Sequence, residues 1–522
     1  MAEMSASERC QATPELVNMI ISFLDNNDQL NCLCVNTMWH NLALANVLKH
    51  ISDCPHDNIL RRQKVLTLLA QPLVRSALVR NSGHIRSLEF GRFSILNLLV
   101  EAPNCTRLVS LRCYLGIFSL RMLNMLAPFI CQNPHLISVH FESIPGTIDL
   151  QELGRALQTC RGLSSLHLQM ASNVSYTLLG SLIRDLARPH LWLKDLDLNL
   201  PVGDTPAEGW ALFERDQRDF APLFPRLEEL RFNDDSGRSY VLAENFYLPV
   251  LNEAAALKTL YIPDMPYEDC EAAVESIARQ RPPLERLYFE TGTSHPGFVD
   301  IVKNSRKTLR VLEAHELDPT VCASMLQSFV QVNESDLCYQ MNLREITFVL
   351  AESPTASALM QKVLISLPNL ECFTQETVGM YPDWIPGRLE IRDMVATSWV
   401  CHGLIKLSLC LGCHTAENNV EETEQERRTK IGQVYKQLGV LTQLEHLTLR
   451  CNVLDWPSKV EFDFTIESGL KAMEPCLTNL QALDIQGVAG SRFSTKEKKW
   501  MREHTPQAAL SYTPYENHDD EI

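Results

Sequence analysis

Residues 163–168 read Leu-Ser-Ser-Leu-His-Leu, and residues 193–198 read Leu-Lys-Asp-Leu-Asp-Leu. Both stretches place apolar residues at the first, fourth and sixth positions and polar residues between them. The same spacing recurs outward from them in both directions along the chain. Its thirteen good copies begin at Ile85, Leu108, Leu136, Leu163, Leu193, Leu227, Leu257, Leu284, Leu309, Leu343, Leu404, Leu444 and Leu480. A degenerate copy covers Leu370 and Phe373, with Gln375 at its third apolar position. Such internal repetition predicts a repeat architecture.

The residue between the second and third apolar positions is polar, charged or tyrosine in every good copy. These residues are Glu89, Arg112, His140, His167, Asp197, Arg231, Tyr261, Tyr288, Glu313, Thr347, Ser408, Thr448 and Asp484. Because side chains alternate between the two faces of a strand, this pattern predicts half-buried strands with one shared outward row. Arg112, His140, His167, Arg231, Tyr261 and Tyr288 are candidate contacts for a partner, although plain solvation explains most of them individually.

Segments with helical spacing lie between the strands, as in Leu178–Leu186 and Ala273–Ile277. Strand and helix in alternation predict an α/β fold: an irregular leucine-rich-repeat solenoid, a horseshoe with a parallel sheet on its concave face. The repeats are uneven, because the asparagine that usually follows the strand is clear only at Asn452. Residues 417–430 are rich in charge and are expected to form an exposed loop or helix.

A different pattern precedes the repeats and predicts three short helices. Thr13 suits an N-cap and Pro14 the first helical position. Asp28 is expected to cap the second helix. Apolar residues on the three helices are Leu16, Ile20 and Leu24, then Leu30, Leu33 and Val35, then Trp39, Leu42, Ala43 and Val47. A core this small is rarely stable alone, so the module is expected to need a partner or the next domain.

Residues 13–48 resemble the F-box. The shared features are Pro14-x-Leu16, Phe23-Leu24, Asp28 with Leu30, and Val35-x-x-x-Trp39. Thr13 departs from the usual leucine and Asn36 from the common cysteine. The uneven repeats and residues 500–504 are also similar to the F-box/leucine-rich-repeat families of filamentous fungi.

The resemblance implies a substrate receptor of Skp–cullin–F-box ubiquitin ligases, without catalysis of its own or a cofactor. A Skp-type adaptor, and through it a cullin ligase, would dock on the helical module, and the solenoid would hold an unknown target protein. The residues expected to contact the adaptor are Pro14, Leu16, Ile20, Leu24, Leu30, Val35 and Trp39. The alternatives are a plain helical cap for the solenoid, a repeat scaffold or GTPase-regulating solenoid without a ubiquitin role, and a thiol-dependent enzyme.

Bulk properties exclude some classes of partner. A net charge of −17 argues against nucleic-acid binding through phosphate neutralisation and against a polybasic membrane anchor. The first residues lack a signal pattern, so a cytoplasmic or nuclear location is expected, with the 17 cysteines reduced. The expected domains are a disordered tail (1–12), the F-box (13–50), a helical linker (51–82), the solenoid (83–490) and a terminal cap with an acidic tail (491–522).

Two motifs imitate ligand sites. Residues 410–414 match the haem-attachment pattern C-x-x-C-H and, with Cys401 and His402, could supply zinc ligands, but Cys410 ends a repeat strand, so coincidence is the favoured interpretation. Residues 195–199 imitate a calcium loop but lack its glycine and its final glutamate, and they read as a strand. No metal is therefore predicted.

Overall fold

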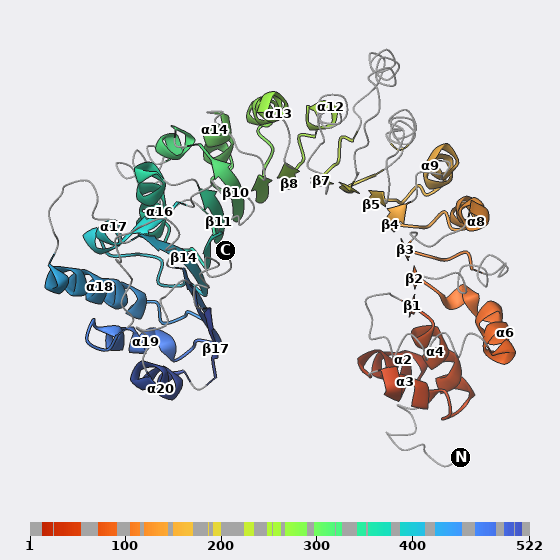
Figure 1. The fold of residues 1–522 in the computed structure, drawn as a ribbon. Helices are drawn as coiled ribbons and strands as arrows, with labels where there is room; N and C mark the ends of the chain where they lie inside the picture. Colours follow the sequence, from red (N-terminus) through yellow and green to blue (C-terminus); the bar gives the residue numbers. More distant parts are fainter. Residues whose placement is uncertain are drawn as a thin grey trace, which may run out of the picture. The chain divides into compact units, whose positions relative to one another are not determined.

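The computed structural model divides the chain into two compact units, residues 1–256 and 257–522. The structure describes residues 13–24, 26–53, 71–90, 105–114, 120–144, 150–170, 186, 192–199, 224–233, 248–252, 254–262, 267–289, 297–318, 320–325, 342–350, 353–376, 387–412, 423–450, 465–486, 495–505 and 507–513. The expected tails and the stretches around Leu178, Cys413 and Asn452 lie outside these residues, apart from Leu186. Each unit is built mainly from parallel strands with helices on one face (Figure 1).

Unit 1 begins with three helices, α2 (Pro14–Phe23), α3 (Asn26–Cys32) and α4 (Thr37–Val47), where the sequence predicts them. The chain then enters a parallel sheet. Its strands are β1 (His50–Asp53), β2 (Ser87–Phe90), β3 (Ser110–Tyr114), β4 (Ser138–Ile144), β5 (Ser165–Met170), β6 (Asp195–Asn199) and β7 (Glu229–Asn233). Each strand from β1 to β6 pairs with the next in sequence.

Unit 2 continues the same design. Its strands are β8 (Thr259–Ile262), β9 (Arg286–Phe289), β10 (Val311–Leu317), β11 (Glu345–Leu350), β12 (Cys372–Gln375), β13 (Leu389–Glu390), β14 (Lys406–Gly412), β15 (His446–Arg450), β16 (Ala482–Gln486) and β17 (Ala509–Thr513). The sheet runs in sequence order, except that β12 pairs directly with β14 while the short β13 lies beside the end of β14.

The registers confirm the repeat pattern. Within each unit, the middle apolar residue of a copy pairs with that of the next, as Leu88 with Leu111 and Leu447 with Leu483. These residues are almost wholly buried. Burying a leucine contributes about 1.5–3 kcal/mol relative to leaving it exposed, so a one-residue slip of any strand would carry a large penalty.

Helices cover the buried face of each sheet. In unit 1 they are α6 (Pro72–Arg80), α8 (Leu120–Cys131), α9 (Leu150–Gln158) and α12 (Leu248–Leu251). In unit 2 they are α13 (Tyr267–Gln280), α14 (Gly297–Asn304), α16 (Pro354–Ser366), α17 (Ile391–Ala396), α18 (Glu424–Gly439), α19 (Glu474–Leu477) and α20 (Thr495–His504). The predicted helix at Ala273–Ile277 is confirmed within α13, and its apolar residues are buried. The charged stretch expected at 417–430 contributes the start of α18, which Thr423 and Glu426 open with a capping box.

Three details differ from the sequence-based expectations. Strand β1 lies in the stretch expected to be a helical linker, and β17 lies in the expected cap, so the parallel pairing reaches further at both ends. Asp28 does not cap α3; it lies inside the first turn of a helix that starts at Asn26. Gln375, the polar residue of the degenerate copy, is buried because its side-chain amide is satisfied: it accepts from Cys410 N at 2.8 Å and donates to Gly387 O.

Candidate functional site

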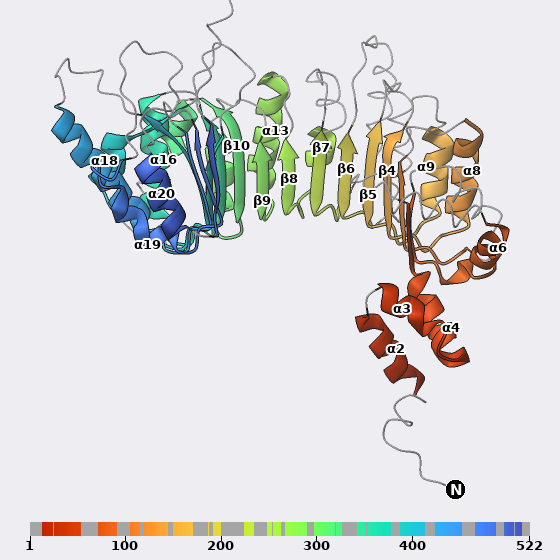
Figure 2. The ribbon, with the colours of Figure 1, turned by 60° about the horizontal axis from the view of Figure 1, so that its bottom comes forward.

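The three N-terminal helices enclose a small apolar core. Val17 and Ile21 of α2, Cys32 of α3 and Ala43 of α4 are buried there. Partly buried residues packed against this core are Leu24, Leu33, Met38, Trp39 and Leu42. In Figure 2 the helices lie beyond the amino-terminal ends of the unit 1 strands, and α4 leads directly into β1. The helices therefore form a distinct module at that edge of the unit.

Local polar contacts explain why the chain turns twice within this module. The side chain of Gln29 donates from Nε2 to the carbonyls of Ile21 (3.1 Å) and Leu24 (3.0 Å), which satisfies carbonyls near the end of α2. Asn36, the departure from the usual cysteine, accepts from Trp39 N at 3.0 Å and caps α4. Asn36 therefore stabilises the start of α4.

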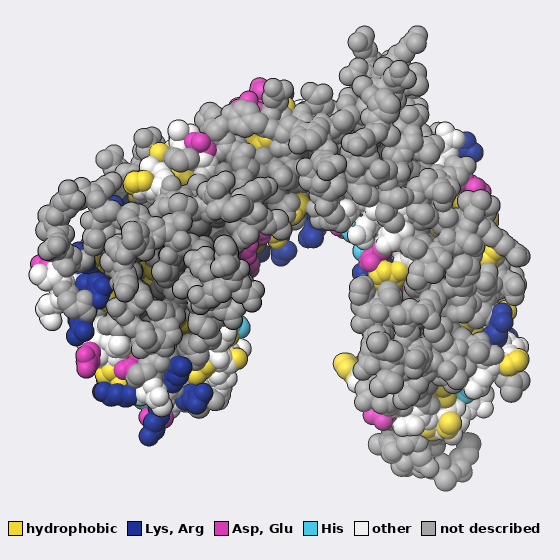
Figure 3. All heavy atoms as spheres, in the orientation of Figure 1, with side chains coloured by type: hydrophobic (Ala, Val, Ile, Leu, Met, Phe, Trp, Pro, Cys, Tyr) yellow, Lys and Arg dark blue, Asp and Glu magenta, His cyan; other side chains and the backbone are white. Residues whose placement is uncertain are grey.

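The module exposes apolar side chains that its own fold does not cover, four of them on α2 and one, Val35, after α3. Phe23 is 84% exposed, and Leu16, Met19, Ile20 and Val35 are also exposed. Figure 3 shows hydrophobic side chains at the surface of the region where Figure 1 places α2–α4. We call Leu16, Met19, Ile20, Phe23 and Val35 the apolar face. Clustered exposed hydrophobics of this kind mark interaction sites.

The predicted contact residues divide into two groups. Pro14, Leu16, Ile20 and Val35 are exposed, whereas Leu24 and Trp39 pack against the module's own core. The side chain of Leu30 lies outside the described residues. Met19 and Phe23 were not among the predicted residues but are exposed on the same helix, and positions 16, 19, 20 and 23 follow the helical spacing that places side chains on one face.

Trp39 leads to a prediction about stability. Because its ring is only partly buried, Trp39→Ala should destabilise the module by about 2 kcal/mol, less than the roughly 3–5 kcal/mol typical of a fully buried ring. Amide hydrogen exchange of α2–α4 in the full chain measures this loss. Trp39→Phe, which keeps a packed ring, serves as the control, and equal losses in both variants would contradict the explanation.

The outward row of unit 1 forms a second candidate site. Arg112 contacts Glu142 at 2.7 Å and Glu89 at 3.6 Å, and His140 Nε2 lies 2.7 Å from the same Glu142. The rings of His140 and His167 stack with centroids 3.8 Å apart, and His167 Nδ1 lies 2.6 Å from Asp197. In unit 2, Tyr261 and Tyr288 lie side by side on the equivalent row, with ring centroids 5.9 Å apart. The outward side chains are thus preorganised by contacts with one another.

His140 makes the stability of unit 1 depend on pH. Burial, then the neighbouring His167 and Arg112, lower the pKa of His140 from 6.5 to about 4, and Glu142 offsets this only in part. The unfolded state therefore binds the proton more tightly, so the associated stability is complete above pH 6.5 and is lost as the pH falls toward 4. Between pH 7.5 and 5 we expect a loss of about 2 kcal/mol in denaturant unfolding of the wild type. His140→Gln should remove this part of the slope; an unchanged slope would contradict the assignment.

Every described cysteine whose pKa is shifted has a raised pKa, so none of these thiols is activated as a nucleophile. Burial raises the pKa of Cys105, Cys322, Cys401 and Cys476 to about 12. Cys410, the first residue of the C-x-x-C-H pattern, is a buried residue of β14. Within the described ranges, no group of three or more His, Cys, Asp or Glu is placed to hold a metal ion. Nor does any described helix combine the length and apolarity needed to cross a membrane.

Comparisons with known proteins identify the module. The family model of the F-box domain matches residues 13–51, the stretch that forms α2–α4 and the start of β1. A search of curated proteins finds no match. Among 74 matching chains of solved structures is the crystal structure of the Rad7 and Elc1 complex in yeast, at 12% sequence identity and a TM-score of 0.36, with 98% of each chain covered. The family match and the parallel repeats together establish that this chain carries an F-box domain followed by an α/β solenoid of parallel strands.

Proposed function

We propose that this protein is the non-catalytic substrate-recognition subunit of a Skp–cullin–F-box ubiquitin ligase. The observation that carries the proposal is the apolar face of the F-box, with Phe23 exposed over 84% of its surface. In the proposed complex a Skp-type adaptor covers this face and links the chain to a cullin in the cytoplasm or nucleus. The solenoid holds the target protein.

The roles of the predicted contact residues follow from their burial. Pro14, Leu16, Ile20 and Val35 are open to a partner and would lose water-exposed area on docking. Leu24 and Trp39 would act mainly by packing against the core of the module, which positions these exposed side chains. Met19 and Phe23 join the proposed contact set because they extend the exposed face along α2. The module is small, so the adaptor would also contribute to its stability.

The target would be held on the sheet face that the helices leave open in one unit or in each. The outward row of each unit lies on that face, with charged groups in unit 1 and tyrosines and hydroxyl groups in unit 2. A receptor of this kind accelerates ubiquitin transfer by raising the effective concentration of the target beside the charged enzyme, so it needs no catalytic group of its own. Burial raises the pKa of Cys322 and Cys401, so these two thiols are poor candidates for a nucleophile.

Co-expression of the full chain with a Skp-type adaptor tests the proposal. We expect a stable complex that co-purifies through size-exclusion chromatography, with a dissociation constant of about 1 μM or below. Folded full-length protein that fails to bind the adaptor at about 10 μM would contradict the ligase function. It would favour the alternative, a repeat scaffold or GTPase-regulating solenoid that binds its target without a ubiquitin role.

A further inference from the structure

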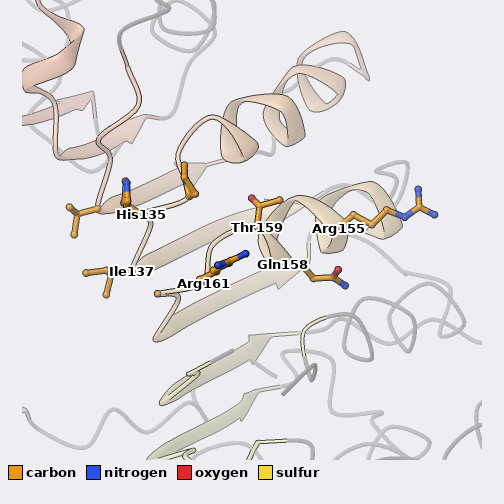
Figure 4. Close-up of a pocket in the computed structure, with 9 residues that line it drawn as sticks. His135, Ile137, Arg155, Gln158, Thr159 and Arg161 are labelled. Carbon is orange, nitrogen blue, oxygen red and sulfur yellow. The ribbon is translucent and has the colours of Figure 1, made fainter. Parts of the chain in front are cut away.

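A second surface lies at the edge of unit 1 where the strands begin. The loops before β3, β4 and β5 and the last turns of α9 enclose an open depression of about 970 Å³ (Figure 4). We call it the rim groove and define it by Val109, His135, Ile137, Arg155, Arg161 and Gly162. It belongs to loops on the strand-entry edge and is separate from the outward row on the sheet face.

Two aliphatic side chains line the rim groove and are called its floor here. Ile137 is 45% exposed, and Val109 occupies the equivalent position one repeat earlier. The backbone around them is already paired, because Ile137 N donates to Val109 O and Ser164 N donates to Ile137 O, both at 2.8 Å. The floor therefore offers apolar side chains to a ligand, with its backbone groups satisfied.

The border of the rim groove is cationic. Arg155 on α9 and Arg161 before β5 are exposed, and the lining residues include no Asp or Glu. Within the described part of the chain, no carboxylate forms an ion pair with either arginine. The same edge continues to Trp192, which is 49% exposed, with the guanidinium of Arg226 3.3 Å from the centre of its ring. This local positive charge runs against the net charge of −17 of the whole chain.

Gly162 lines the groove without a side chain of its own. A Cβ atom built on Gly162 would meet only Leu136 O, at 3.9 Å, so the backbone leaves room for a substitution at this lining position. Gly162 therefore offers a way to fill the groove without disturbing its walls.

We propose that the rim groove binds an acidic protein segment that inserts an aliphatic side chain between carboxylates. Arginine pairs well with carboxylates, and Val109 and Ile137 would bury the anchor. Single-stranded nucleic acid is the less suitable ligand, because it is usually held by aromatic stacking platforms, whereas the residues that line the groove include no Phe, Tyr or Trp. The surface is additional to the proposed adaptor and target contacts, and its test does not require either partner.

Fluorescence anisotropy with the full chain tests this proposal. The probe is a fluorescein-labelled peptide of about twelve residues in which Asp and Glu flank a central Leu-Leu pair. Replacing its acids with Asn and Gln, or its leucines with alanine, should each weaken binding at least tenfold. Raising the salt concentration should weaken binding of the parent peptide, since screening reduces the charge contribution. Absence of binding at about 1 mM would overturn the proposal, as would tighter binding of oligo(dT) of equal charge.

Variants locate the binding. Arg161→Glu and Gly162→Tyr should each lower the affinity at least tenfold, the first by reversing charge and the second by filling the groove. Arg279→Glu on α13, a similarly exposed arginine in unit 2, is the matched control and should leave the affinity unchanged. Circular dichroism confirms that each variant is folded. Equal affinity in all three variants would overturn the assignment to this groove.

Discussion

Trp399→Ala is expected to lower the free energy of unfolding of unit 2 by about 4–5 kcal/mol. Trp399 is among the largest fully buried side chains of the described residues. Its ring nitrogen donates to Gln361 Oε1 at 3.2 Å, and Gln361 in turn donates to Thr397 Oγ1 at 2.8 Å. The substitution would leave a cavity and also remove the donor from a buried amide oxygen, so two costs add.

Two controls separate these costs. Trp399→Phe keeps most of the ring but removes the donor, so it should lose about 1–2 kcal/mol. Val400→Ala alters the neighbouring side chain, which is exposed, and should lose under about 1 kcal/mol. Urea unfolding followed by circular dichroism measures all three. A loss below about 2 kcal/mol for Trp399→Ala would contradict the fully buried position of the ring and its hydrogen bond to Gln361.

Ile20→Asp is expected to weaken adaptor binding at least a hundredfold if the apolar face is the docking site. Ile20 lies in the middle of α2 between Leu16 and Phe23, and 39% of its surface is exposed. Docking would enclose the introduced carboxylate among apolar side chains, where an unpaired charge is costly. A hundredfold loss corresponds to about 2.7 kcal/mol, well within that cost. Isothermal titration calorimetry with the full chain and a Skp-type adaptor measures it.

Ile405→Asp provides a closely matched control. Ile405 is the same residue type with the same 39% exposure, but it precedes β14 in unit 2. Its substitution should leave adaptor affinity unchanged. Because Ile20 does not belong to the buried core of the module, both variants should remain folded. Equal affinities in the two variants would remove the apolar face as the docking surface, while an adaptor bound elsewhere would keep the broader function.

Much of the fold could be predicted because the apolar pattern within each repeat strand is regular, although the spacing between copies is uneven. The three-position apolar pattern identified good copies whose middle residues pair in register, including Leu88 with Leu111 and Leu447 with Leu483. The end strands were harder, since β1 carries Ile51 beside Ser52 and Asp53 without the full pattern. In β12, the polar Gln375 made the repeat hard to recognise from the sequence. Its burial depends on hydrogen bonds with Cys410 and Gly387, which are distant in the sequence.

The candidate docking site was predicted less completely. The motif pointed to Leu16, Ile20 and Trp39 together, yet helical spacing alone cannot say which of two apolar faces a short helix buries. In the folded module, α2 turns Val17 and Ile21 inward and leaves Leu16, Ile20 and Phe23 outward. The rim groove had no sequence signal, because its walls come from loops of three successive repeats and from α9.

The sequence by itself determined that this chain forms an α/β repeat of parallel strands after a short helical module, because alternation and capping are local properties of neighbouring residues, and the motif in that module carried the resemblance to the F-box. Only the tertiary structure decided which apolar side chains of the F-box are left uncovered, that His140 and His167 stack, and that arginines from α9 and a strand-entry loop border one groove. The physical reason is that exposure, ring stacking and grooves depend on distances between residues far apart along the chain, and those distances are set by how the repeats pack.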